Sequence, residues 1–285
     1  MRKAILETEY LDDDGLETPE VGPWAEEKYR IVGLYDRLFS TGMKKKWDCR
    51  VYIDLYSASG HARIKGTQKI IAGSPLIALG VPNSFDKYIL CEKKPKLMKA
   101  LQQRVSKKFP AADVSYVRGD CNEKVQDILA QIPPHSKGKT VLSFCFIDPF
   151  NIGIEFETIR ILAGKIMDFL IVLAVGMDAT RNEAQYTDPS NTQIDKFLGD
   201  TTWRARWRQA QVSKVPFRHF LAQEYATQMA VLGYAKITVE KMKEVKSDDK
   251  NLPLYHLAFF SKNKMGYKFW DEVLKYSDPQ QSLVF

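Results

Sequence analysis

The feature that most constrains this chain is a series of apolar runs of strand length, separated by segments with helical periodicity. Five such runs lie between residues 50 and 175, namely Arg50–Asp54, Lys87–Glu92, Val114–Val117, Thr140–Asp148 and Asp168–Val175. Strands that are apolar on both faces are typical of a parallel sheet covered by helices on both sides. We therefore expect an α/β fold in which the carboxyl ends of the strands meet along one edge.

Helical spacing of apolar residues predicts a helix before the first run and others between the runs. Helices are expected to begin near Trp24 and at Pro95, and further helices to cover residues 125–132 and 156–166. A short helix is expected at Ser74, with its side chain as the N-cap and a proline in the first turn.

The pattern changes after the fifth run. Residues 177–215 are polar and contain no clear strand, so we expect an insertion there. A helix from Pro216 follows, and then two β-rich runs, Ala235–Val245 and Leu254–Phe260, are expected to form a hairpin.

Five parallel strands followed by a hairpin is the strand inventory of class I S-adenosylmethionine-dependent methyltransferases. The expected fold is Rossmann-like, with a mostly parallel seven-stranded sheet, a terminal β-hairpin and helices on both faces. We expect residues 1–23 to form a flexible arm and residues 24–285 to form one domain with the insertion.

An acidic residue stands at or just beyond the end of each of the first four strands: Asp54, Glu92, Asp120 and Asp148. Uncompensated carboxylates at one edge favour a ligand rich in hydrogen-bond donors. S-adenosyl-L-methionine is such a ligand, since it presents an ammonium group, two ribose hydroxyls and an exocyclic amine. We expect Asp54, Gly60, Glu92 and Asp120 to bind this cofactor, with Glu92 on the ribose.

Each of these residues also has a structural interpretation. Gly60 either allows a ligand to approach the backbone or completes a tight turn. Glu92 could instead pair with Lys93 or Lys94. Asp120 could accept from the adenine amine, cap the following helix, or do both.

The sharpest motif is Asp148-Pro149-Phe150, at the end of the fourth strand. It resembles the catalytic loop of amino-methyltransferases, in which the acid and the proline-shaped backbone hold a target amine while the aromatic ring stacks on the base. Proline fixes the turn and presents a carbonyl group without an N–H. We expect these three residues to be catalytic; a plain strand-ending turn is the alternative.

The polar insertion contains tryptophans and arginines at alternate positions. In a helix, Trp203 would neighbour Trp207 and Arg204 would neighbour Arg208. Arginines interleaved with aromatic rings suit phosphate contact and base stacking, so Trp203, Arg204 and Arg208 are candidate substrate-binding residues. The alternative is a helix whose tryptophans pack on the core.

The net charge of +7 over 285 residues favours an anionic partner, of which nucleic acid is the commonest, or else reflects solvated lysines. The 4 cysteines form no CxxC pair, and the 4 histidines are scattered, so no metal site is expected. The N-terminal residues do not resemble a signal peptide, and no run is long enough to cross a membrane. We expect a soluble, cytoplasmic protein.

Several segments together resemble the three-Cys-motif partner protein family, over residues 24 to 276. They are Trp24…Lys28, Tyr52-Ile53-Asp54…Gly60, Gly73-Ser74-Pro75-Leu76, Phe146-Ile147-Asp148-Pro149-Phe150, Tyr255-His256-Leu257…Phe259-Phe260-Ser261 and Gly266…Phe269-Trp270. The resemblance implies a methyltransferase fold and a partner protein with a three-cysteine motif. The first loop departs from the family's Asp-Gly-Phe-Ala-Gly-Pro-Gly at Leu55, Ser57, Ala58 and Ser59.

Two functions follow as hypotheses. The first is an S-adenosylmethionine-dependent methyltransferase that acts on a nucleic-acid base amine. The second is a catalytically silent methyltransferase-fold protein that works in a complex with a three-cysteine-motif protein. A nicotinamide-dependent oxidoreductase is disfavoured, because the glycine-rich fingerprint of those enzymes is missing.

Overall fold

The computed structural model describes residues 10–179, 182–247 and 251–277. The chain divides into two compact units. Unit 1 combines residues 1–146 with residues 263–285, and unit 2 is the stretch from Ile147 to Lys262. The sequence predicts one domain from residue 24 onwards, whereas the contacts divide that stretch in two.

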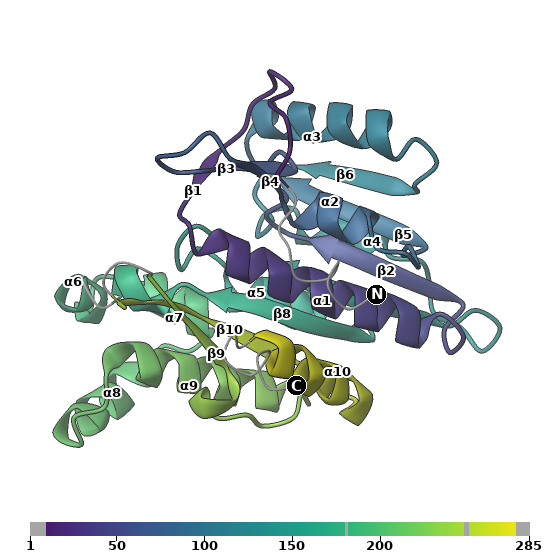
Figure 1. The fold of residues 1–285 in the computed structure, drawn as a ribbon. Coiled ribbons are helices and arrows are strands. Elements are labelled where there is room, and N and C mark those ends of the chain that lie inside the picture. Colours follow the sequence, from purple (N-terminus) through teal and green to yellow (C-terminus); the bar gives the residue numbers. More distant parts are fainter. Residues whose placement is uncertain (1–9, 180–181, 248–250, 278–285) are drawn as a thin grey trace. The chain divides into compact units, whose positions relative to one another are not determined.

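Unit 1 contains a parallel sheet of the apolar runs predicted from the sequence (Figure 1). Its strands are β2 (Cys49–Asp54), β5 (Lys87–Glu92), β6 (Val114–Arg118) and β7 (Val141–Ile147). They lie in the order β6-β5-β2-β7, and each neighbouring pair is parallel. In chain order this is third, second, first, fourth, which is the Rossmann arrangement with its switch point between β2 and β7. The predicted α/β class is therefore confirmed.

The helices of unit 1 are α1 (Ala25–Met43), α2 (Ser74–Leu79), α3 (Pro95–Lys108), α4 (Val125–Gln131) and α10 (Lys264–Ser277). Helix α1 packs against α10 and α2. Tyr35 of α1 contacts Phe144 of β7 at 4.7 Å between ring centroids and Trp270 of α10 at 6.3 Å. Helix α10 therefore completes the core that α1 begins.

Gly42 lets α10 approach α1 closely. A Cβ atom at Gly42 would lie 2.4 Å from the ring of Phe269, so the ring would have to shift. Helix α2 begins differently from the prediction. Its N-cap is Gly73 without a side-chain capping bond, and Ser74 and the following proline occupy the first turn. The predicted Ser74 N-cap is wrong by one residue.

A second, three-stranded sheet in unit 1 was not predicted. It has the order β1-β3-β4, from β1 (Glu20–Val21), β3 (His61–Ile64) and β4 (Ile70–Ala72). Strand β1 is parallel to β3, and β4 is antiparallel to it. Strands of two to four residues are too short for a hydrophobic period to reveal them.

Arg104 of α3 anchors residues 14–18 of the expected flexible arm. Its side chain is 4% exposed, and its Nη2 lies 2.7 Å from an Asp14 oxygen. Arg104 Nη1 donates to the carbonyl oxygens of Glu17 at 3.0 Å and Ser59 at 2.8 Å. The bond from Arg104 lowers the pKa of Asp14 to about 2. Arg104 therefore holds residues 14–18 in place, while residues 1–9 lie outside the described residues.

Unit 2 contains the predicted hairpin. Its strands are β8 (Met167–Leu173), β9 (Lys243–Lys246) and β10 (Pro253–Phe260), in the antiparallel order β8-β10-β9. Strand β9 is shorter than the predicted Ala235–Val245, because residues 239–241 form a 3₁₀ turn, η3 (Val239–Lys241). Over the described residues, these three strands and the four parallel strands of unit 1 supply the predicted number of seven.

The polar segment expected as an insertion forms helices in unit 2. The helices of this unit are α5 (Phe156–Leu162), the π-helical turn η2 (Val175–Ala179), α6 (Glu183–Thr187), α7 (Gln193–Leu198), α8 (Trp203–Val212) and α9 (Phe217–Val231). Helices α7 and α8 pack against α9. In the described parts of the chain, every helix is too short or too polar to cross a membrane.

We predict that Arg104→Met lowers the free energy of unfolding by about 1.5–3 kcal/mol, because buried hydrogen bonds of a charged group are lost. Hydrogen exchange of the amides of residues 14–18 should accelerate in the same variant. The matched control is Arg63→Met, whose partner Asp13 is more exposed and lies 2.6 Å away. Equal effects of the two substitutions in chemical denaturation would contradict the anchoring role of Arg104.

Candidate functional site

Glu92 joins three loops at one edge of the unit 1 sheet. Its Oε2 accepts a hydrogen bond of 2.9 Å from the Ala58 amide, in the loop after β2. Its Oε1 accepts one of 2.7 Å from the Lys94 amide, and its carbonyl oxygen accepts one of 3.1 Å from the Gly119 amide after β6. The Glu92 side chain therefore bonds to backbone amides, and the alternative of a pair with the Lys93 or Lys94 side chain is not observed.

Asp54 at the end of β2 is completely buried. Its Oδ1 accepts from the Tyr56 amide at 3.1 Å, and its Oδ2 accepts from the Tyr52 hydroxyl at 3.2 Å. The first bond shapes the loop that leads to Ala58, since it holds the backbone two residues beyond the strand. Asp54 therefore fixes the start of the loop from inside the core.

Asp36 of α1 is a second buried acid in this region, and the sequence analysis did not identify it. The residue is completely buried, and neither oxygen has a hydrogen-bond partner among the described residues. Burial raises the pKa of Asp36 well above its ordinary value, and the Asp54 carboxylate raises it further. The protonated acid is therefore favoured beside Asp54. The available signal was an acid on the apolar stripe of a helix, one residue after Tyr35.

The loop after β2 contains two left-handed residues. Ala58 has φ +48° and Gly60 has φ +78°. A left-handed conformation costs an alanine free energy that glycine avoids. A Cβ atom at Gly60 would lie 2.9 Å from Leu101 and 3.0 Å from Leu76. Gly60 is thus required both for its conformation and for the packing of α2 and α3, as the tight-turn interpretation expects.

Asp120 follows β6, and its side chain is 26% exposed. One oxygen accepts from the Asn122 amide at 2.9 Å, and the other lies 3.0 Å from the Lys93 ammonium. The N-cap of α4 is Lys124, so Asp120 stabilises the turn before the helix and does not cap it. Asp54 and Glu92 are the last residues of β2 and β5, and Asp120 follows the neighbouring strand β6, so the three acids lie at the ends of adjacent strands.

Three cysteines lie close to these strand ends. Cys91, Cys121 and Cys145 are buried free thiols. Burial raises the pKa of the Cys121 thiol to about 11, and it raises that of Cys91 still further. Because reactive cysteines are thiolates, these three are small apolar core residues.

The Asp148-Pro149-Phe150 loop lies in unit 2, directly after β7. Asp148 is half-buried and Pro149 is buried. The Phe150 side chain is completely exposed, although large apolar side chains are usually covered. An exposed ring after a buried proline is available for stacking on a planar ligand.

The Trp203 segment differs from a nucleic-acid surface. Trp203 is completely buried, and its Nε1 donates to Asp195 at 2.7 Å. Arg204 also bonds to Asp195 and to the Asn191 carbonyl. The alternative of tryptophans packed on the core therefore describes this helix, and of the three candidates Arg208 alone is exposed.

Two histidines expected to be isolated are in fact neighbours. The ring centroids of His219 and His256 are 5.7 Å apart, and both face Glu244. The sequence interpretation was wrong because 36 residues separate His219 from His256 along the chain. Strand pairing and helix packing bring them together.

No family model matches the chain, and no curated protein matches it. Solved structures give weak similarities. The protein LPL1258 from Legionella pneumophila, of family model DUF519, is 13% identical over 87% of this chain and 91% of its own, with a TM-score of 0.48.

Two structures solved with S-adenosyl-L-methionine show weaker similarities. Trm1 from Pyrococcus horikoshii, in complex with S-adenosyl-L-methionine, is 11% identical over 87% of this chain and 57% of its own, with a TM-score of 0.44. The O-methyltransferase TomG from Streptomyces achromogenes, also with this cofactor, is 11% identical over 80% and 79%, with a TM-score of 0.40. All three TM-scores are below 0.5, so a functional proposal has to depend on the geometry of the site.

We predict that Ala58→Gly raises the free energy of unfolding by up to about 1 kcal/mol, because glycine adopts the left-handed conformation without strain. The matched control is Ala62→Gly at a buried position of strand β3, which should destabilise the protein instead. Chemical denaturation of the two variants gives the signs. A loss of stability in both would show that the Ala58 conformation is not strained.

Proposed function

We propose that the chain is an S-adenosylmethionine-dependent methyltransferase, with its cofactor site at the edge formed by Asp54, Gly60, Glu92 and Asp120. The observation that carries this proposal is the position of Glu92. Its carboxylate lies at the end of a central parallel strand and bonds to the loop after the neighbouring strand β2. In Rossmann-type sheets, an acid in this position accepts hydrogen bonds from the ribose hydroxyls of an adenosine ligand.

The other residues suit the rest of the cofactor. Asp120 is partly exposed, so its carboxylate is available to the exocyclic adenine amine beside its present partners. Asp54 acts from within the core, because it orients the loop that would lie against the methionine part. Gly60 maintains the same loop against α2 and α3. When bound, the cofactor supplies the methyl group as an electrophile.

We assign the acceptor side to Asp148, Pro149 and Phe150. The Asp148 carboxylate and the Pro149 carbonyl would accept hydrogen bonds from a base amine and orient it. Phe150 is exposed and would stack on the base. Such catalysis is mainly positioning of the two reactants. A base within a duplex would have to be flipped out first.

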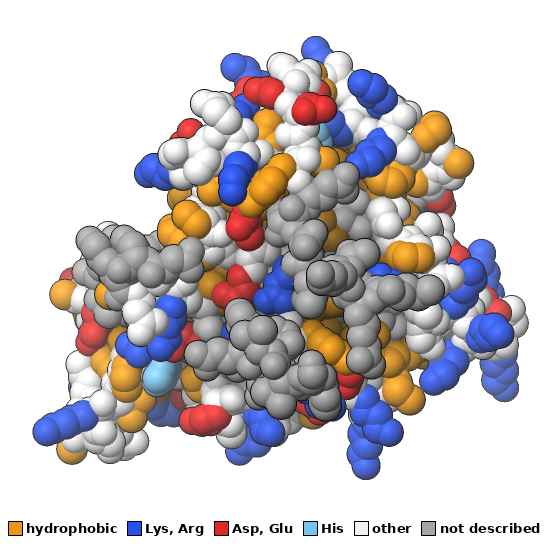
Figure 2. Space-filling model, in the orientation of Figure 1, with side chains coloured by type: hydrophobic (Ala, Val, Ile, Leu, Met, Phe, Trp, Pro, Cys, Tyr) orange, Lys and Arg blue, Asp and Glu red, His pale blue; other side chains and the backbone are white. Residues whose placement is uncertain are grey.

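Nucleic acid is the proposed substrate because of the net charge of +7. On the face drawn in Figure 2, lysine and arginine side chains stand at several separate places, with acidic side chains among them. Among the candidate substrate-binding residues, the exposed Arg208 remains part of the proposal. Trp203 and Arg204 are left out, because each is already bonded within unit 2.

The second candidate function is a silent partner protein in a complex with a three-cysteine-motif protein. It is favoured by the loop after β2, in which Ala58 is left-handed and its amide is bonded to Glu92. A loop closed onto the ribose-binding acid in this way would have to open for the cofactor. Cofactor binding by the purified chain separates the two functions.

We predict that Glu92→Ala weakens S-adenosylmethionine binding by about 1.5–3 kcal/mol, the scale of hydrogen bonds to a charged group. Calorimetry measures the change. Glu123→Ala is the matched control, because it removes an exposed acid just after Asp120 and should leave affinity unchanged. Circular dichroism verifies that both variants fold. Unchanged affinity in Glu92→Ala would rule out the ribose assignment.

We predict that Asp148→Ala lowers methyl transfer by about 10²–10³-fold while most cofactor binding remains, because the acid positions the acceptor amine. Radiolabelled cofactor offered with total DNA and total RNA measures the transfer. Glu157→Ala, an exposed acid of α5, is the control.

If nucleic acid is the substrate, its binding should weaken steeply as salt rises, because phosphate contacts release counterions. If the chain binds the cofactor but transfers no radiolabel to DNA or RNA, nucleic acid is not the substrate. Absence of cofactor binding would favour the silent partner protein.

A further inference from the structure

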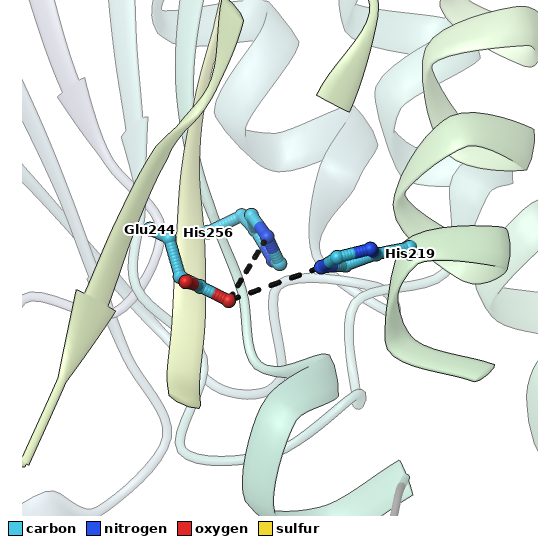
Figure 3. A group of neighbouring side chains, drawn as sticks. All are labelled: His219, Glu244 and His256. Atoms are coloured by element: carbon cyan, nitrogen blue, oxygen red, sulfur yellow. Dashed lines mark ion pairs between the residues drawn. The ribbon is translucent and has the colours of Figure 1, made fainter. Parts of the chain in front are cut away.

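Unit 2 brings together three side chains of the kind that bind metals. They are His219 of α9, Glu244 of β9 and His256 of β10 (Figure 3). Glu244 Oε1 lies 3.8 Å from His256 Nε2 and 3.9 Å from His219 Nε2. One ligand atom from each residue lies within 4.8 Å of the other two. Figure 3 shows both rings directed at the carboxylate.

Rigid elements hold this group in place. Glu244 and His256 are directly opposite partners in the antiparallel β9–β10 ladder. Their side chains therefore leave the same face of the sheet. Helix α9 presents His219 to that face, and α9 packs against η3, the turn before β9. Sites on helices and strands keep ligand positions better than sites on loops do.

Two buried polar atoms of this group have no hydrogen-bond partner among the described residues. His256 is 2% exposed, and neither its Nδ1 nor Glu244 Oε1 has a hydrogen-bond partner among the described residues. A buried polar atom without a partner costs free energy, so such atoms point to a missing interaction. The unbonded Oε1 is the carboxylate oxygen that faces both imidazoles.

Two cations adjoin the carboxylate and affect it differently. Lys246 Nζ lies 3.3 Å from Oε2, the oxygen that does not face the histidines. A contact of this kind orients a ligating carboxylate, as outer hydrogen bonds do in metal sites. Arg218 Nε lies 3.6 Å from Oε1 and makes no hydrogen bond among the described residues. Arg218 therefore competes for the oxygen that a metal ion would use.

We infer that His219, Glu244 and His256 bind one divalent first-row transition-metal ion, for which Zn²⁺ is the best match. Two imidazole nitrogens and one carboxylate oxygen are donors that zinc accepts. In a tetrahedral zinc site the ligand atoms lie about 3.3 Å apart. The carboxylate–imidazole separations of 3.8 and 3.9 Å therefore have to shorten by roughly half an ångström, and the two imidazole nitrogens, which lie within 4.8 Å of each other, have to approach as well. Both the half-exposed His219 side chain and the Glu244 carboxylate therefore have to turn toward the ion.

Three protein ligands leave a tetrahedral ion with one open position. Structural zinc sites use four protein ligands, whereas sites with three retain water or a substrate atom. His219 also lines a surface groove of about 540 Å³ with Lys214, Glu224 and Glu240. The ion would therefore be accessible from this groove through the His219 side. This site is independent of the proposed cofactor site, because it involves only residues of unit 2.

The experiment uses the full-length chain after treatment with EDTA and dialysis. Calorimetric titration with Zn²⁺ alone should give one site per chain. Titration with Co²⁺ should give the strong visible absorption of a four-coordinate ion. Replacements at the buried His256 are avoided because they threaten the fold, so Glu244→Gln and His219→Ala are the test variants. Each should weaken Zn²⁺ binding by at least about 100-fold, since even the loss of an outer contact costs about 10–100-fold.

Two further variants make the test specific. Glu240→Gln removes a carboxylate that lines the same groove near His219 but is not one of the three proposed ligands, so Zn²⁺ affinity should fall far less than in Glu244→Gln. Arg218→Gln removes the competing cation, so affinity should stay the same or rise. Failure of the wild type to bind Zn²⁺ or Co²⁺ would overturn the inference. Equal losses in Glu240→Gln and Glu244→Gln would overturn it too, since binding would then follow surface charge.

Discussion

The hydrogen bond from the Ala58 amide to the Glu92 carboxylate connects the ends of two strands of the unit 1 sheet. The loop after β2 depends on it, because Asp54 fixes the start of that loop and Gly60 fixes its far end between α2 and α3. The loop after β6 joins the same point through the Gly119 amide. The Glu92 carboxylate already accepts these loop hydrogen bonds. Any ligand that binds to Glu92 therefore has to use the same carboxylate that holds the loops together.

The sequence predicts those parts of the structure that local periodicity determines. The strand Lys87–Glu92 has the predicted bounds, and Asp54, Glu92 and Asp120 end adjacent strands, because parallel order follows from apolar runs and connecting helices. Arg104 and Asp36 could not be predicted in their roles. Arg104 contacts residues about 90 positions away, and the burial of Asp36 depends on how α1 packs.

Two groups of residues in unit 2 show the same difference between what local periodicity predicts and what packing determines. Alternate tryptophans and arginines suggest a binding surface, but the sequence does not reveal that Asp195 takes both the Trp203 and the Arg204 donors. Conversely, His219, Glu244 and His256 have no metal-motif spacing. They meet because a β-hairpin places two of them opposite each other and a helix supplies the third. Pairing and packing, and not spacing, create this candidate site.

Unit 1 is assembled from two separate stretches of the chain, and this affects the order in which it can be completed during synthesis. Phe269 lies on Gly42 and Trp270 lies on Tyr35, yet more than 220 residues separate each pair. During synthesis α1 leaves the ribosome long before α10. The part of α1 that α10 covers therefore stays exposed while the whole of unit 2 is made. Nascent chains with uncovered apolar surface are prone to aggregate. The fold of unit 1 therefore depends on α10, and on protection of the apolar face of α1 until α10 has been made.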